Sequence, residues 1–338
     1  MTARNNPEIA IPALLVERPA LARTDGTLAT PEQLAQRYQR FLAAATSDNT
    51  RRTYRSAIRH FQAWGGVLPC DEATVIRYLL TFAEALNPRT LSLRLTALSQ
   101  WHCYQGFSDP VATATVRKTL RGIERVHGRP RQKAKALLLE DLDRIVAHLN
   151  SVADLAALRD SALLQVGYFG AFRRSELVAL EVRYLHWERE GLRITLPRSK
   201  TDQEGQGLDK AIPYGDSICC PAKALRSWLD AAQIEQGPLF RRISRWGVVG
   251  DSALNVGGVN AILTARAKEA DLPHAPEMSS HSLRRGLATS AHRAGAGFLE
   301  IKRQGGWRHD GTVQGYIEEA GAFEENAAGS LLRRKQDP

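Results

Sequence analysis

Apolar residues recur at intervals of three and four along most of this chain, which is the spacing of amphipathic helices. The stretch from Val182 to Arg198 departs from this pattern, because apolar and polar residues alternate there with the period of a β-strand. We expect the segment Glu188 to Gly191 to form the turn between two strands, and Lys210 to Pro213 to add a short third strand. These patterns together predict a mainly α-helical protein with a small antiparallel sheet.

The length of the chain and one basic segment predict two domains. A chain of 338 residues is longer than a typical single domain. Residues 128–137 are basic, contain glycine and proline and lack an apolar period, as is typical of a linker. We therefore expect a helical bundle over residues 30–127 and a larger, mostly helical domain with the sheet over residues 138–338. Residues 1–29 show no sustained periodicity and are expected to form a flexible arm.

Capping residues mark several helix starts in the first domain. Thr30 precedes Pro31 and is followed three positions later by Gln33, which is the pattern of a capping box. Asp71 and the pair Asn87-Pro88 mark two further starts by the same reasoning.

Two predicted helices of this domain carry basic stripes at a spacing of four residues. The chain as a whole has a formal net charge of +10, which favours a polyanionic partner. A charged stripe is usually a solvated helix face, but two almost purely basic ones in a small domain favour phosphate contacts. The stripes consist of Arg51, Arg55 and Arg59, and of Arg117, Arg121 and Arg125.

Several features of the composition exclude other classes of protein. No apolar run is long enough to span a membrane, and the chain opens without the pattern of a signal peptide. The four cysteines show neither metal-ligand spacing nor a disulfide framework. We therefore expect a cytoplasmic protein with reduced thiols, without a membrane partner, a metal or another cofactor.

The stretch from His281 to Tyr316 holds groups suited to phosphate chemistry. His281 and Arg284 are three apart, so a helix would place them on one face. Trp307 offers a ring N–H, and Arg173 supplies a second guanidinium from much earlier in the chain. A phenol has an ordinary pKa of about 10, and neighbouring guanidinium groups make it easier to ionise. Tyr316 could then attack phosphorus and hold it covalently.

Each of these signals is weak alone, but their order and spacing together form a specific pattern. It comprises Arg173-x-Ser175-Glu176-Leu177, Lys200, His281-x-x-Arg284, Gly305-Gly306-Trp307 and Tyr316. The pattern resembles the tyrosine recombinase (integrase) family over roughly residues 31 to 334. Within the family the likeness is greatest to Cre-type recombinases, because most members have His at the position of Trp307.

The resemblance implies a role for each matched residue. Arg173 and Arg284 would clamp the two non-bridging phosphate oxygens, and His281 would accept or donate a proton. Trp307 would stabilise charge through its ring N–H, and Glu176 would be a buried carboxylate that holds the site. The alternative for Glu176 is an ordinary ion pair within a helix.

The resemblance also assigns the proton donor and the nucleophile. Lys200 would protonate the departing sugar oxygen, although Lys210, at the far end of the same turn, is a plausible rival. Tyr316 would form a 3′-phosphotyrosyl link and release a 5′-hydroxyl, so that neither ATP nor a metal is needed. A 5′-hydroxyl from another strand would then reseal the backbone.

The resemblance extends to assembly on DNA. The two domains would close around a double-stranded target site as a clamp. Phe323, Ala327 and Leu331 are spaced by four, which predicts an amphipathic tail helix. That helix would dock into a neighbouring protomer in a homotetramer on two DNA sites. The resemblance also implies a bacterial or phage-encoded protein that associates with the nucleoid.

Three alternatives to a site-specific recombinase stay open from the sequence. A type IB-like topoisomerase or telomere resolvase shares the same chemistry. A DNA-binding protein without strand cleavage would need neither Tyr316 nor Lys200. A phosphatase would not need the two basic stripes or a clamp-like linker.

Overall fold

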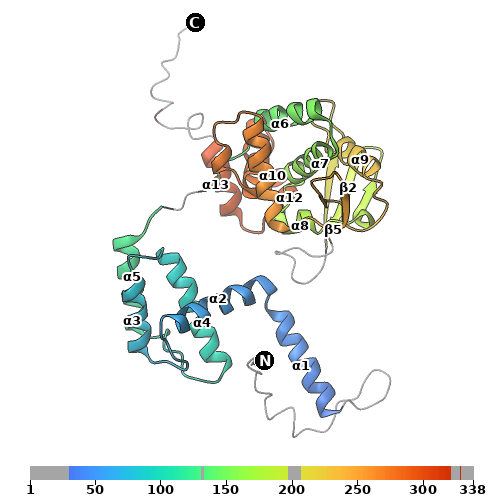
Figure 1. Ribbon diagram of the computed structural model, residues 1–338. Coiled ribbons are helices and arrows are strands. Elements are labelled where there is room, and N and C mark those ends of the chain that lie inside the picture. The colour runs from blue at the N-terminus through green and yellow to red at the C-terminus, as the bar shows by residue number, and fades with distance from the viewer. Residues whose placement is uncertain (1–29, 131–132, 197–206, 321–327, 329–338) are drawn as a thin grey trace. The chain divides into compact units, whose positions relative to one another are not determined.

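The computed structural model describes residues 30–130, 133–196, 207–320 and 328. The chain divides into two compact units, Met1–Arg131 and Gln132–Pro338, and both are visible in Figure 1. The division falls inside the segment 128–137. The expected arm (1–29), Lys200 and nearly all of the expected tail helix lie outside the described residues.

The first unit is a helical bundle. Its helices are α1 (Pro31–Ala45), α2 (Asp48–Ala63), α3 (Glu72–Phe82), α4 (Pro88–Tyr104) and α5 (Ala114–His127). The predicted caps are confirmed, since Thr30 and Gln33 form a capping box and the side chains of Asp71 and Asn87 accept backbone N–H bonds. The apolar faces of α2 to α5 meet in one core that includes Phe61, Val75, Tyr78, Leu79, Leu91, Leu95, Leu98, Val116 and Ile123.

The second unit is built around one buried helix. This helix, α7 (Leu155–Phe169), is buried at every position from Ala157 to Tyr168 except Leu158. It packs against α6, α8, α9 and α11. The other helices described in this unit are α6 (Leu139–Val152), α8 (Arg174–Val178), α9 (Pro221–Ala231), α10 (Val256–Glu269), α11 (Ser280–Arg293), α12 (Phe298–Gly305) and α13 (Asp310–Ala320).

The predicted antiparallel sheet is present, with a shorter first strand than expected. Its strands are β1 (Leu185–Trp187), β2 (Gly191–Leu196) and β3 (Leu208–Pro213), in that order. Leu185 pairs with Ile194, and Ile194 pairs with Lys210. The alternation from Val182 to Tyr184 was misleading, because these residues form a 3-10 turn.

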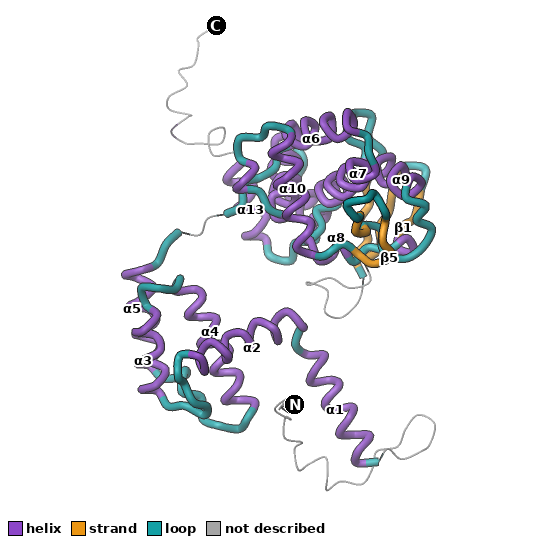
Figure 2. Tube along the Cα trace, in the orientation of Figure 1, coloured by secondary structure: helices purple, strands orange, loops and turns teal. Residues whose placement is uncertain are grey.

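A second hairpin was not predicted from the sequence. It consists of β4 (Arg241–Ile243) and β5 (Val249–Ala253), which pair antiparallel with an irregular register. Figure 2 shows both sheets as short orange segments in a largely helical unit. The prediction of a mainly α-helical fold with small antiparallel sheets is thus confirmed.

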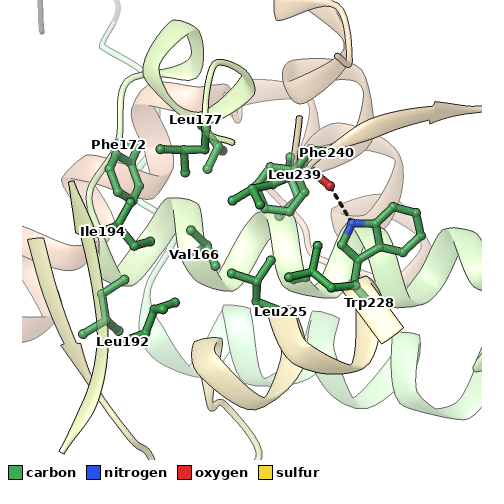
Figure 3. Packing of buried hydrophobic residues seen from close by; sticks show 14 of the residues in the cluster. Val166, Phe172, Leu177, Leu192, Ile194, Leu225, Trp228, Leu239 and Phe240 are labelled. Atoms are coloured by element: carbon green, nitrogen blue, oxygen red, sulfur yellow. Dashed lines mark hydrogen bonds between the residues drawn. The ribbon is translucent and has the colours of Figure 1, made fainter. Parts of the chain in front are cut away.

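One apolar core joins the sheet to α7, α8 and α9. Figure 3 shows Leu192 and Ile194 of β2 facing Val166 of α7 and Leu225 of α9. The indole N–H of Trp228 donates to the carbonyl of Leu239 at 2.8 Å, so this buried donor is satisfied. Phe172 and Leu177 lie in the same core. The backbone on both sides of Arg173 is therefore held by close packing.

The end of the segment 128–137 packs on the second unit. Leu137 is fully buried, and its N–H donates to the carbonyl of Ser282 on α11 at 3.1 Å. Gly286 allows this approach, because a Cβ at that position would lie 1.7 Å from the carbonyl oxygen of Leu137. Among the described residues, no helix is both long enough and apolar enough to cross a membrane.

Candidate active site

Arg173 stands at the start of α8, where its side chain is held by Glu176. The guanidinium donates to one carboxylate oxygen of Glu176 at 2.6 Å, and the backbone N–H of Arg173 donates to the other at 2.9 Å. Glu176 is only 7% exposed. A charge-assisted pair of this kind orients the guanidinium and leaves further N–H groups for an anion. The structure therefore shows the helix ion pair that the sequence left as an alternative, and shows that its carboxylate is buried.

Arg284 lies on α11 and is 4% exposed. Its guanidinium donates to the carbonyl of Ala171 and to that of Gly305, the latter at 3.1 Å. It also lies over the ring of Trp307, 4.9 Å from the ring centroid. These contacts fix the orientation of the guanidinium. His281 lies one turn earlier on the same helix and is exposed.

The pKa of Arg284 is lowered to about 10, mainly by burial and also by repulsion from the Arg173 guanidinium. The Glu176 carboxylate and the Tyr316 phenol act on this pKa in the opposite direction. The side chains of Arg173, Glu176, Arg284 and Tyr316 thus form one electrostatic cluster. An anion bound there would relieve the repulsion between the two guanidinium groups.

Trp307 follows a tight turn at the end of α12. Gly306 takes a left-handed backbone conformation, with φ of +63°, and ends the helix. Trp307 is 7% exposed and packs in an apolar cluster with Ala171, Ala288, Ile301 and Val313. The indole is therefore a packing residue of this cluster as well as a candidate donor.

Tyr316 lies on α13 against the Trp307 ring. The two ring centroids are 5.8 Å apart, with an interplanar angle of 66°. The guanidinium of Arg285 lies 5.4 Å from the centre of the Tyr316 ring. Helix α13 packs against α11 and α12, which brings a residue near the end of the chain beside Arg284.

The profile of the phage integrase family matches residues 135–322, which is more than half of the chain. The chain is also 35% identical, over 312 residues, to an "Integrase/recombinase xerD homolog" from Selenomonas ruminantium. That alignment covers 90% of this chain and 91% of the relative. The chain belongs to the phage integrase family. The expected membership of the tyrosine recombinases is therefore confirmed.

Solved structures of this family share the fold. A XerH site-specific recombinase bound to palindromic difH substrate matches with a TM-score of 0.58 and 16% identity, over 81% of this chain and 80% of that one. A lambda integrase dimer bound to a COC' core site matches with a TM-score of 0.58 and 15% identity, over 86% of this chain and 78% of that one. At such identities the likeness establishes the fold alone. The particular closeness to Cre stays a prediction.

In this member of the family, Lys210 lies within the cluster of Arg173, Glu176 and Arg284. Its ammonium donates to the carbonyl of Gln304 at 2.5 Å and lies 5.2 Å from the centre of the Phe172 ring. Its pKa is lowered to about 7, mainly by burial and also by repulsion from Arg284 and Arg173, while Glu176 acts in the opposite direction. Lys200, the residue expected to be the acid, lies outside the described residues.

Two residues near the site were missed by the sequence analysis. Gln304 donates its side-chain amide to the carbonyl of Phe169 at 2.7 Å and to that of Ala211 at 3.3 Å. Its position directly before Gly305-Gly306 was the available signal. Arg285 was passed over because Arg284 occupies the family position beside it.

The predicted DNA-contacting arginines lie away from the core of the first unit. In α2 the buried side chains are Ala57 and Phe61, and in α5 they are Val116 and Ile123. Five of the six arginines are exposed, while Arg51 is half-buried and paired with Asp48. Among the described residues, no group of three or more His, Cys, Asp or Glu side chains is placed to hold a metal.

Proposed function

We propose that this chain is a site-specific DNA recombinase that cuts and rejoins double-stranded DNA through a covalent bond to Tyr316. One observation carries the proposal. Arg173, Arg284 and Tyr316 come from three separate segments, yet the fold collects them into one cluster supported by the buried Glu176. Binding DNA without cutting it would not need a tyrosine beside two partly desolvated guanidinium groups.

The two arginines would hold the scissile phosphate. Arg173 keeps one contact to Glu176 and Arg284 keeps two to backbone carbonyls. The remaining N–H groups of each guanidinium would bind the non-bridging oxygens, where negative charge grows during attack. The face of the Trp307 ring would stabilise the guanidinium of Arg284 by a cation–π contact.

The reaction would proceed as a displacement at phosphorus. The Tyr316 oxygen attacks and forms a 3′-phosphotyrosyl bond, its proton passing to a base for which His281 is the proposed residue. The bond from phosphorus to the 5′-oxygen breaks, and Lys200 protonates that oxygen as it leaves. Attack by a 5′-hydroxyl of another strand reverses the step and releases Tyr316. The number of phosphate ester bonds is unchanged, so no ATP is required.

Contacts outside the cluster would supply binding and assembly. The arginine stripes of α2 and α5 would bind phosphates without reading the bases, and the two domains would enclose the duplex as a clamp. The chain after Tyr316 would form a tail helix that docks cyclically into neighbouring protomers of a tetramer on two sites. We also propose the domain boundaries expected from the sequence, with a helical DNA-binding domain over residues 30–127 and a catalytic domain over residues 138–338.

Selection of bound sequences from random duplex DNA, followed by a strand-exchange assay on the selected site, tests this function. We expect products that join strands of two different duplexes. A type IB-like topoisomerase or resolvase is the second candidate, because the same cluster would serve its chemistry. Resealing within one duplex, without exchange between two, would favour that candidate. Binding without any covalent adduct would overturn both.

A further inference from the structure

Lys210 is a buried cation that the proposed mechanism does not use. It lies on β3 opposite Ile194 of β2 and is 2% exposed. Buried lysines usually have a charged or strongly hydrogen-bonding partner, because removing an ammonium from water is unfavourable. The contacts that Lys210 makes therefore indicate why a lysine is buried at this position.

Those contacts join β3 to the end of α12. The Lys210 ammonium donates to the Gln304 carbonyl at 2.5 Å, and the Gln304 amide donates back to the carbonyl of Ala211, next to Lys210, at 3.3 Å. The same amide reaches the Phe169 carbonyl at the end of α7 at 2.7 Å. Three elements thus meet at this pair of residues, which we call the Lys210–Gln304 staple.

The staple lies directly before the segment that holds the candidate active site. The next residue, Gly305, accepts a hydrogen bond from Arg284, and Trp307 follows after the turn at Gly306. A Cβ on Gly306 would lie 2.8 Å from Leu208 and 3.9 Å from the Lys210 ammonium, so β3 packs closely on this turn. A shift of β3 relative to α12 would therefore move the carbonyl that orients Arg284.

The charges around Lys210 predict that a bound anion would change its protonation. The charged groups that act on it are Arg284 of α11, and Arg173 and Glu176 at the start of α8. Two of the three are cations, so repulsion adds to burial in disfavouring the ammonium. A phosphate between the two arginines would reverse part of this repulsion. The ammonium form, which makes the stronger bond to a carbonyl, would then be favoured when DNA is bound.

We propose that Lys210 is a positioning residue for strand cleavage, which fastens β3 to the Gln304–Trp307 segment and thereby holds Arg284 and Trp307 in place around the phosphate. The proposal rests on the proposed recombinase function. It assigns Lys210 a role distinct from that of Lys200, the proposed acid. Lys210 would act through Arg284 and Trp307 rather than on the departing oxygen.

The test compares three variants in single-turnover cleavage of the selected duplex, nicked so that the released fragment diffuses away. Lys210→Met keeps the buried aliphatic stem but removes the donor, and Gln304→Met removes the amide while keeping side-chain length. Lys268→Met is the matched control, because Lys268 is exposed on α10. We expect both staple variants to cleave at least tenfold more slowly with DNA affinity changed less than threefold, and the control to cleave at the normal rate.

Two further readouts separate positioning from other roles. On DNA with sulfur in place of the departing 5′-oxygen, Lys200→Ala should recover, whereas Lys210→Met should stay slow. The rate of wild-type cleavage should change with pH as Lys210 titrates, and the Lys210→Met protein should lack this change. A merely structural role for Lys210 would produce no such difference. Thermal unfolding confirms that each variant is folded.

The opposite results would overturn the proposal. Recovery of Lys210→Met on the sulfur substrate would make Lys210 the acid, and normal cleavage by the folded variants would make the staple structural only. If Lys210→Met fails to fold, Gln304→Met decides by the same measurements. Failure of the proposed function is distinct, since the wild-type chain would then form no covalent adduct at all.

Discussion

Replacing Gly286 with alanine tests how closely α11 must approach the chain before α6. A Cβ on residue 286 would lie 1.7 Å from the Leu137 carbonyl oxygen and 2.8 Å from a ring carbon of Tyr168. Neither neighbour can yield easily, because one is backbone and the other is a fully packed ring. Helix α11 would have to move away from residue 137. That movement would stretch the bond from the Leu137 N–H to the Ser282 carbonyl, which is 3.1 Å long.

Three contributions set the expected loss of stability. Overpacking of a well-packed interior costs about 1–3 kcal/mol. Loss of the backbone hydrogen bond between Leu137 and Ser282 costs about 1 kcal/mol. The higher helix propensity of alanine returns about 1 kcal/mol in a helix interior. The sum is a decrease of about 1–3 kcal/mol in the free energy of unfolding of the second unit.

Urea unfolding followed by circular dichroism measures this change. Gly315→Ala is the matched control, because Gly315 is also inside a helix of the second unit and its added Cβ would meet nothing within 4 Å. That variant should gain up to about 1 kcal/mol from helix propensity alone. A Gly286→Ala protein as stable as the wild type would show that α11 and residue 137 do not pack as described.

Three further predictions follow from the charges and the tail. Since burial lowers the Lys210 pKa to about 7 from an ordinary 10.5, the unfolded chain binds a proton that the folded one lacks between those pH values. The free energy of unfolding should therefore rise with pH by up to about 1.4 kcal/mol per unit in that window, and Lys210→Met should lose this rise in urea titrations at pH 7 and 9. Neutralising Arg51, Arg55 and Arg59 together should flatten the plot of log affinity against log salt by about one unit per lost contact; an unchanged slope would mean a solvated face. Deleting the residues after Gly321 should leave a folded protein that binds one site but loses cooperative gel shifts on two adjacent sites, and surviving cooperativity would contradict the tail's proposed role.

The helices were predictable because their signals are local. Thr30, Asp71 and Asn87 cap the helices that they were expected to cap, and Leu91, Leu95 and other apolar positions of α4 face the core. The strand prediction was weaker, because alternation over three residues does not distinguish β1 from the 3-10 turn before it. The β4–β5 hairpin was missed because none of its residues is buried, so its sequence shows no clear alternation of apolar and polar residues.

For the candidate site, the sequence named residues that the fold brings close together, but it did not predict the contacts that hold them. The motif pattern named Arg173, Arg284, Trp307 and Tyr316, and the fold collects all four. The carbonyl groups that hold Arg284 are set by the packing of α11 against α12. Local sequence patterns do not predict packing between these segments. The burial of Lys210 likewise depends on the register of β3 with β2 and on the placement of Gln304.

Mapping the covalent bond between protein and DNA tests whether Tyr316 is the nucleophile. The wild-type chain is incubated with the nicked selected duplex, the adduct is digested with protease and nuclease, and the linked peptide is sequenced by mass spectrometry. We expect a 3′-phosphate on Tyr316, and we expect the Tyr316→Phe protein to bind the duplex but form no adduct. An adduct on any other residue, or one that persists in Tyr316→Phe, would contradict this assignment.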